Sequence, residues 1–310
     1  MIAFRRTESK VPLPKKIMAL KIWFDGKLVD ESEARVSVFD HGLLYGDGVF
    51  EGIRFYEGRV FRLQAHIQRL FDSSKAIMLK LPWTQEELCK NTCETIRANG
   101  LRDGYVRLLV TRGVGTLGLS PDSCPTPTLI IIAASIQLYP DSDYEVGLKV
   151  ITCSTRRPTH GSLSPQVKSL NYLNNVMAKV EAMRAGGREG LMLNEPGYVA
   201  ECTGDNVFTD KNGVIYTPPV SDGGLDGITR GGIFELAAQM EVPIVEKTMT
   251  RFDIYTADEC FLTGTAAEVI PAVELDHRPI GEGVPGPTTA RFIEAYRELV
   301  RNSGTSIEAM

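Results

Sequence analysis

The chain has 310 residues, of which 43% are hydrophobic and 24% are charged, with a formal net charge of −5. This composition is typical of a globular protein, and the length predicts two domains, because a single core stops growing at about 250–300 residues. The negative charge and the absence of any long basic run argue against a nucleic-acid partner, and no apolar stretch reaches the roughly 20 residues of a membrane helix.

The cysteines and histidines give no sign of a disulfide framework or a metal site. Six cysteines without a CxxC pair favour a reduced, cytoplasmic compartment. Cys89 and Cys93 have a spacing that could bridge a metal on an expected helix, but no histidine is near, and we interpret both as small buried residues. The four histidines form no ligand pair, so no metal is expected.

Residues 1–17 are polar, include five basic residues and lack the apolar core of a secretory signal. They are predicted to form a disordered arm. Met18 opens the segment Met-Ala-Leu-Lys-Ile-Trp-Phe-Asp-Gly, which reads as the start of a first strand, so Met1 and Met18 are both candidate translation starts.

The first half of the chain shows strand and helix patterns in turn. Period-2 alternation and Asp-Gly or Glu-Gly turns predict strands at residues 21–24, 27–29, 48–56, 59–62, 104–112 and 128–134. A helix is expected from residue 63 to about 78, and the capping box Thr84-Gln-Glu-Glu87 opens a second helix that Gly100 closes. Residues 113–124 read as a Gly/Pro/Ser-rich loop.

Two of these strands carry candidate site residues. In strand 48–56, Phe50, Gly52 and Arg54 share one face because successive side chains alternate. In strand 104–112, Tyr105 and Arg107 share a face, which fits either a carboxylate site or an exposed sheet face.

Periodicity is interrupted at residues 139–145, which are predicted as a linker between a small α/β domain (18–138) and a large domain (146–310). The second half resumes with a strand at residues 146–152 and has several short strands between residues 190 and 217.

One lysine of the second half is a candidate catalytic residue. Pro165 and the apolar spacing after it predict that Lys168 lies at a helix N-terminus, with Tyr172 one turn further on. The partial positive charge of that helix end favours a neutral, nucleophilic amine that can form a Schiff base. The same pattern also fits a solvated lysine, so the local sequence leaves both interpretations open.

Three further features accompany the lysine. Glu201 lies among apolar and small residues, where a carboxylate is costly without a cationic partner. Gly227-Ile228-Thr229 opens an expected helix whose free N–H groups could bind phosphate, and Gly264-Thr265-Ala266 is interpreted as a second small-residue turn of the same type. A lysine, a buried carboxylate and phosphate donors are together what pyridoxal 5'-phosphate (PLP) requires.

The order of these motifs resembles that of the fold-type IV (class IV) PLP-dependent aminotransferases, and among them the branched-chain amino acid aminotransferases. The resemblance extends from Trp23 to about Ala295. It rests on Tyr45-Gly-Asp-Gly-Val-Phe-Glu-Gly-Ile-Arg54, Lys168-Ser-Leu-Asn-Tyr172, Glu201 to Phe208, Gly227-Ile-Thr-Arg230 and Gly264-Thr-Ala-Ala-Glu268. It implies two α/β domains, the second with a barrel-like sheet, PLP between them, and a homodimer or higher oligomer in which residues 113–124 shape the pocket.

The resemblance also implies roles for individual residues. Lys168 would be the catalytic Schiff-base lysine, Glu201 would hold the pyridine nitrogen and Tyr172 the ring hydroxyl. The phosphate would be held by Arg69, Ile228, Thr229 and Thr265. The substrate pocket would be lined by Tyr45, Phe50, Tyr105, Arg107, Thr265 and Ala266.

The substrates implied are L-leucine, L-isoleucine and L-valine, with 2-oxoglutarate and glutamate as the second pair. Two departures from the family pattern bear on this specificity. Many branched-chain enzymes have proline where this chain has Leu108. The enterobacterial type has a pocket tryptophan in the interdomain loop, and this chain has Gln137-Leu-Tyr139 near that position instead. Alternatives within the fold are a D-amino acid or (R)-amine transaminase and aminodeoxychorismate lyase. A relative that binds without catalysis is a fourth alternative.

Overall fold

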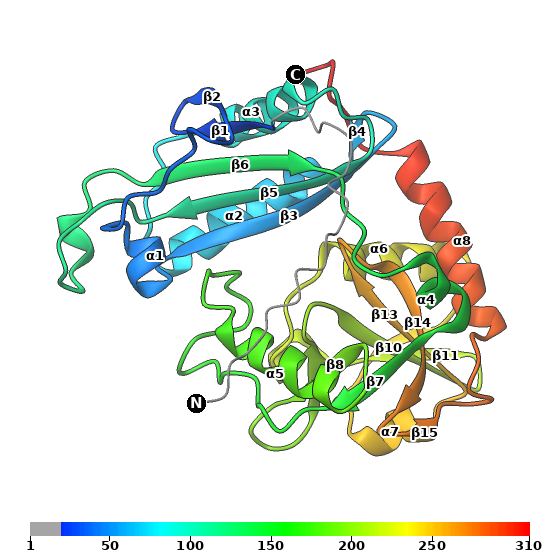
Figure 1. Cartoon of the computed structure of the whole chain (residues 1–310). Coiled ribbons are helices and arrows are strands. Elements are labelled where there is room, and N and C mark those ends of the chain that lie inside the picture. Colours follow the sequence, from blue (N-terminus) through cyan, green and yellow to red (C-terminus); the bar gives the residue numbers. More distant parts are fainter. Residues whose placement is uncertain (1–19) are drawn as a thin grey trace, which may run out of the picture.

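A computed structural model describes residues 20–310 (Figure 1). The predicted arm at residues 1–17 and the choice between Met1 and Met18 lie outside the described residues.

The first sheet has seven strands in the order β16-β4-β3-β5-β6-β1-β2, all paired antiparallel. Its strands are β1 (Lys21–Phe24), β2 (Lys27–Asp30), β3 (Gly48–Tyr56), β4 (Arg59–Val60), β5 (Gly104–Thr111), β6 (Thr128–Ala134) and β16 (Thr305–Ser306). Helices α2 (Leu63–Ala76) and α3 (Gln85–Ala98) cover one face of it (Figure 1). The strands and helices expected for this half are confirmed, with small shifts at their ends.

The core of this unit follows from the alternation seen in the sequence. Val106 and Leu108 of β5 are fully buried against Ile67 and Leu70 of α2, while Tyr105 and Arg107 lie on the opposite, half-exposed face. The predicted capping box at the start of α3 is confirmed, with both reciprocal hydrogen bonds present. The Tyr105 face is thereby left free to meet the second sheet.

The second sheet has nine strands and curls like a half-barrel (Figure 1). Its path is β12-β11-β10-β13-β14-β7-β8-β9, and β15 pairs with β14. The strands are β7 (Leu148–Thr152), β8 (Glu189–Leu193), β9 (Val199–Cys202), β10 (Asn206–Lys211), β11 (Val214–Thr217), β12 (Ile244–Glu246), β13 (Glu259–Gly264), β14 (Glu268–Leu275) and β15 (Arg278–Pro279). The mixed α/β class with a barrel-like second sheet is confirmed.

The helices of this half are α4 (Asp141–Val146), α5 (Leu173–Arg184), α6 (Ile228–Gln239), α7 (Arg251–Tyr255) and α8 (Pro287–Asn302). Helices α6 and α8 pack on the second sheet in one apolar cluster that includes Phe208, Ile233 and Phe292. After α8 the chain returns to the first sheet, where β16 pairs with β4. The segment expected to be an irregular linker holds α4, and Tyr139 packs in the core of the second sheet.

Five of the six cysteines are buried, including Cys89 and Cys93 on α3, as expected. No helix within residues 20–310 has the length and apolar character needed to span a bilayer. The same part of the chain holds no group of three or more His, Cys, Asp or Glu side chains arranged around a metal.

Candidate active site

A pocket lies where the two sheets meet. Gly52 and Tyr105 line it from the first sheet, Glu201 and the Thr265 turn line it from the second, and Lys168 lines it between them. The Tyr105 ring lies over Gly52, where a Cβ atom would be 1.8 Å from the hydroxyl oxygen, so a larger residue at position 52 would displace this ring. Residues from both halves of the chain therefore line one pocket.

Lys168 is held in the pocket by an extended segment. The Phe50 N–H donates to the Lys168 carbonyl at 3.0 Å, and the Leu170 N–H donates to the Gly48 carbonyl at 2.9 Å. Helix α5 begins only at Leu173, so the prediction that Lys168 lies at a helix N-terminus is wrong. Pairing with β3 satisfies the backbone here in place of a helical turn.

The environment of the Lys168 amine is aromatic and polar. Its Nζ donates to the Tyr172 hydroxyl at 3.2 Å and lies 4.7 Å from the centre of the Phe50 ring. The Arg107 guanidinium lies 4.6 Å from the centre of the same ring, so Phe50 contacts both Arg107 and Lys168. Phe50 and Tyr172 contact the Lys168 amine and Arg107 contacts Phe50, but these three are not among the residues found to line the pocket in the described part of the chain.

Glu201 is a buried carboxylate with a cationic partner. It lies on β9, and its Oε1 is 2.8 Å from Nη2 of Arg157, while the Leu225 N–H donates to its Oε2 at 2.8 Å. Burial raises the pKa of Glu201, and Arg157 acts in the opposite direction. Arg157 is itself buried and donates to Asn175 Oδ1 at 2.9 Å.

Arg69 reaches the pocket from α2 and is held by a second buried carboxylate. Its Nε and Nη2 donate to the two oxygens of Glu51 at 2.7 and 2.8 Å, and its Nη1 donates to the Asp226 carbonyl at 2.8 Å. His66 Nδ1 lies 2.7 Å from Glu51 Oε2. Burial would raise the pKa of Glu51, but Arg69 and His66 outweigh it and lower that pKa to about 2.

Helix α6 points its N-terminus at the pocket. Its cap residue is Gly227, which offers no side-chain acceptor, so the first N–H groups of the helix have no capping partner. Ile228 and Thr229 follow, and both line the pocket. Arg69 lines the same pocket, and a helix N-terminus can bind an anion, so the phosphate site remains a prediction.

The turn at Thr265 and Ala266 also reaches the pocket, but it differs from the expectation. It joins β13 to β14 in a hairpin closed by the Gly264–Glu268 pair, whereas the sequence suggested a helix-opening turn. Gly264 packs against Asp205, and a Cβ atom at Gly264 would lie 2.1 Å from Asp205 Oδ1.

Tyr45 is placed away from this pocket. It ends α1 (His41–Tyr45), and its hydroxyl donates to the Leu117 carbonyl in the loop at residues 113–124. Within residues 20–310 it is not among the residues that line the pocket. The structure of a single chain therefore does not bring Tyr45 to the pocket, and its role in substrate binding stays a prediction.

Sequence reasoning did not find four residues that support the site: Glu51, His66, Arg157 and Asp205. Glu51 left a usable signal, because alternation along β3 puts this glutamate on the core face, where a carboxylate needs partners. The sequence around Arg157 gives no comparable signal, because its partner Glu201 is distant in sequence.

Comparisons with known proteins agree with this geometry. The family model for class IV aminotransferases matches residues 48–275. A protein named putative branched-chain-amino-acid aminotransferase, from Methanocaldococcus jannaschii, is 49% identical over 288 residues, which are 93% of this chain and 99% of that protein.

Solved structures are similar over the same length. A branched-chain aminotransferase from Thermoproteus uzoniensis, with norvaline, has a TM-score of 0.87 and 40% identity over 92% of this chain and 95% of its own. One from Thermobaculum terrenum, in PLP form, has a TM-score of 0.83 and 31% identity over 92% of this chain and 94% of its own. The chain therefore belongs to the class IV aminotransferase family.

Proposed function

We propose that the pocket binds PLP, with Lys168 as the lysine that forms the covalent bond to it. The observation that carries this proposal is that Lys168, the start of α6 and Glu201, which is paired with Arg157, all line one pocket. An amine, a buried carboxylate and an anion site match the aldehyde, the ring nitrogen and the phosphate of that cofactor.

The solved relatives support this assignment. One is described in PLP form and another with pyridoxamine 5'-phosphate. Arg69, Ile228, Thr229 and Thr265 would hold the phosphate, and Tyr172 would contact the ring hydroxyl.

The residues of the chain divide the catalytic work. PLP, when bound, supplies an electron sink at the α-carbon of the substrate. Glu201 would face the ring nitrogen and favour its protonated form, with its carboxylate held by Arg157. Lys168 Nζ, once free of its bond to the cofactor, would hold and move the proton that leaves the substrate α-carbon, with the Tyr172 hydroxyl beside it.

We further propose L-leucine, L-isoleucine and L-valine as amino donors and 2-oxoglutarate as acceptor. Solved relatives are described with N-(5'-phosphopyridoxyl)-L-glutamate and with 4-methylvaleric acid, an acidic and a branched apolar ligand. Phe50 offers an apolar wall for the second, and Arg107, which faces the Phe50 ring, offers a cation for the first. Thr265 and Ala266 would contact the substrate at the turn.

A homodimer or higher oligomer, in the cytoplasm, completes the proposal. Exposed apolar side chains lie on residues 38 and 39, on α1 and on the loop bonded to them, and we call them the loop patch: Val38, Phe39, Leu43, Val114, Leu117 and Leu119. A group of exposed apolar side chains is typical of a protein interface. Because Tyr45 bonds this same loop, a second copy seated on the patch would lie next to the segment that holds Tyr45.

The test is a substrate panel with the purified holoenzyme. L-leucine with 2-oxoglutarate is expected to yield glutamate, and D-alanine with 2-oxoglutarate is expected to yield none. Glutamate formation from D-alanine alone would reject the branched-chain assignment in favour of a D-amino acid transaminase.

A further inference from the structure

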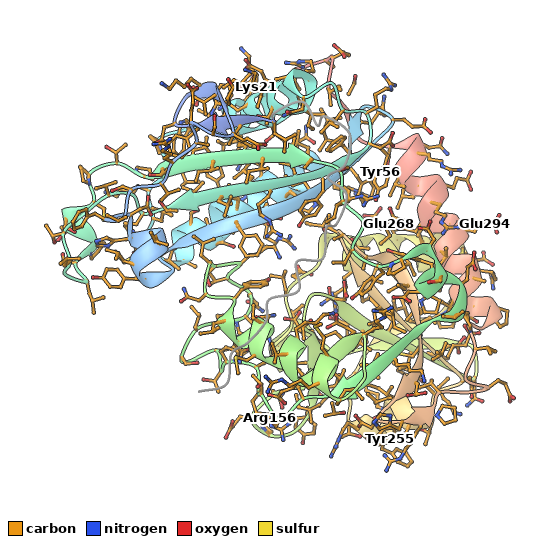
Figure 2. All side chains as sticks on the ribbon, viewed as in Figure 1. Lys21, Tyr56, Arg156, Tyr255, Glu268 and Glu294 are labelled. Atoms are coloured by element: carbon orange, nitrogen blue, oxygen red, sulfur yellow. The ribbon has the colours of Figure 1, made fainter. Side chains whose placement is uncertain are left out.

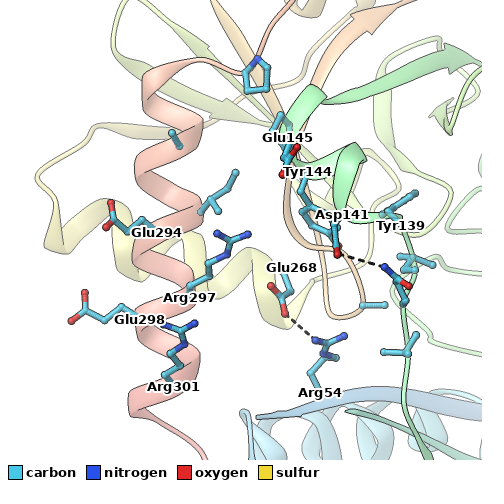
Figure 3. Close-up of a pocket in the computed structure, with 18 of the residues that line it drawn as sticks. Arg54, Tyr139, Asp141, Tyr144, Glu145, Glu268, Glu294, Arg297, Glu298 and Arg301 are labelled. Atoms are coloured by element: carbon cyan, nitrogen blue, oxygen red, sulfur yellow. Dashed lines mark hydrogen bonds and ion pairs between the residues drawn. The ribbon is translucent and has the colours of Figure 1, made fainter. Parts of the chain in front are cut away.

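Two motifs end in charged residues that the proposed chemistry does not use. Arg54 lies near the end of β3 in the first sheet, and Glu268 begins β14 in the second. They are 214 positions apart, yet Arg54 Nη2 donates to Glu268 Oε1 at 3.1 Å (Figure 3). Their side chains are 18% and 20% exposed, and both border a cleft of about 1060 Å³ between α4 and α8.

Tyr56 adds a second contact from the same strand. Its hydroxyl donates to Glu268 Oε1 at 2.8 Å, and the Arg54 guanidinium lies 5.1 Å from the centre of its ring. Burial, with Tyr296 and Glu268 nearby, raises the pKa of Tyr56, so this phenol stays protonated and remains a donor. One carboxylate oxygen thus receives two donors from the first sheet.

Glu268 has an unusual backbone conformation. Its φ of +60° lies in the left-handed region, which a residue other than glycine adopts only when its surroundings hold it there. Glu268 also closes the hairpin whose tip carries Thr265 and Ala266. The conformation of the hairpin tip is therefore linked to what holds the Glu268 side chain.

The hairpin tip lies between the cofactor pocket and the cleft. Ala266 lines both, and the Tyr144 hydroxyl donates to the Ala267 carbonyl at 3.1 Å from the side of the cleft. Gly52 lines the cofactor pocket from the same face of β3 that carries Arg54. Arg54 and Glu268 line the cleft, and neither is among the residues that line the cofactor pocket in the described part of the chain.

We propose that Arg54 and Tyr56 are positioning residues that fix Glu268, and through it the Thr265–Ala266 tip, at the correct distance from the first-sheet wall of the substrate site. This inference rests on the proposed function, in which the tip contacts the substrate. We call the two contacts to Glu268 the Glu268 clamp. Loosening it would weaken substrate binding while Lys168 and the other proposed phosphate residues, Arg69, Ile228 and Thr229, stay in place, because the bonds of Arg54 and Tyr56 go to Glu268.

The chain offers a matched control for the test. Tyr255 also donates its hydroxyl to a carboxylate, Asp276 Oδ2 at 2.6 Å, and also has a guanidinium, that of Arg278, 4.5 Å from the centre of its ring. It lies at the far end of the second sheet from Tyr56 and Glu268 (Figure 2). Tyr255→Phe therefore removes an equivalent bond away from the site.

The experiment compares holoenzymes carrying Arg54→Met, Arg54→Lys, Tyr56→Phe, Glu268→Gln and Tyr255→Phe. KM for both substrates is expected to rise about tenfold or more in Arg54→Met and Glu268→Gln, less in Tyr56→Phe, and to recover in part in Arg54→Lys. kcat should stay within about threefold of wild type, and most of the cofactor should be retained, because Arg69, Ile228 and Thr229 would still hold the phosphate when Thr265 shifts. Tyr255→Phe should match wild type throughout.

Binding of 4-methylvalerate, followed through the cofactor absorbance, gives a readout that needs no turnover and should weaken in parallel with KM. An unchanged KM and probe affinity in Arg54→Met, Tyr56→Phe and Glu268→Gln would overturn the proposal. A loss of cofactor and a fall in Tm in proportion to any rise in KM would also overturn it. A wild-type enzyme that retains cofactor and binds the probe but does not transaminate L-leucine would reject the proposed function instead.

Discussion

The two buried carboxylates of the site show how single residues set its electrostatics. Glu201 and Glu51 are both almost fully buried, yet burial dominates in the first and raises its pKa, whereas Arg69 and His66 outweigh burial in the second and lower its pKa. The difference fits their proposed tasks. A protonated ring nitrogen facing Glu201 would add a second cation beside Arg157 and lower the pKa of this carboxyl, whereas Glu51 already has Arg69 and His66 as partners.

Glu51 gives a pH-dependent prediction. The folded pKa of about 2 lies below the ordinary value of 4.5, so the unfolded chain binds more protons between these values. The stabilisation by Glu51 is thus complete above pH 4.5 and is lost as the pH falls towards 2. Between pH 4.5 and 3, the free energy of unfolding should fall more steeply in wild type than in Glu51→Gln, by up to about 1.4 kcal/mol per pH unit.

Urea unfolding at several pH values measures this difference. Asp258→Asn is the control, because its carboxylate pairs with Lys211 on the surface and such pairs contribute roughly 0–1 kcal/mol. Equal pH slopes for wild type and Glu51→Gln would contradict the account of this carboxylate.

At the scale of elements, sequence periodicity predicts the strands and helices that depend on neighbouring residues in the chain. The strands at 48–56 and 104–112 and the capped helix α3 follow from alternation and capping within a few residues. The apolar spacing of the lysine segment predicts a helix because the same spacing continues into α5. Pairing with β3, which is far away in sequence, keeps residues 168–170 extended instead. Periodicity carries no information on such a partner.

The start of α6 yields a prediction about cofactor binding. A Cβ atom at Gly227 would lie 2.1 Å from Asn206 Oδ1, and Asn206 is buried and bonded to the Leu225 carbonyl at 2.9 Å, so it cannot move away freely. Gly227→Ala should displace the first turn of the helix and weaken PLP affinity of the apoprotein by about tenfold or more, which is about 1.4 kcal/mol.

Gly231 on the same helix is the matched control, because a Cβ atom there meets nothing within 4 Å. Gly231→Ala should keep wild-type PLP affinity and stabilise the fold by roughly 0.5–1 kcal/mol. Titration of both apoproteins with PLP, followed by absorbance, compares them. Equal affinities would show that the α6 start does not hold the phosphate.

At the scale of the whole molecule, the site exists only because distant segments meet. Arg157–Glu201, Arg54–Glu268 and Arg69–Glu51 all join different elements, and the return of β16 to the first sheet depends on the path of α8. The resemblance of motifs in order could predict that Lys168, Glu201 and the α6 start share one pocket. The partners that stabilise those residues required the folded structure.

The loop patch leads to a prediction about assembly. Leu119 is 79% exposed, so Leu119→Asp should change the stability of a single subunit by no more than about 0.5 kcal/mol. In an oligomer formed through the patch, the buried carboxylate would be unpaired, and the fraction of monomer should rise. Sedimentation velocity measures it, with Phe252→Asp, 70% exposed on α7, as the control. A monomeric wild type, or equal behaviour of both variants, would contradict this interface.

The central claim is that Lys168 binds the cofactor covalently, and one measurement tests it directly. Holoenzyme reduced with borohydride and digested with a protease should carry the phosphopyridoxyl group on the peptide that contains Lys168. The Lys168→Ala protein should carry none, and the peptide of Lys179, whose ammonium is paired with Glu189 at 2.6 Å, should remain unmodified. A modified lysine other than Lys168, or no modified lysine in a cofactor-loaded enzyme, would contradict the account.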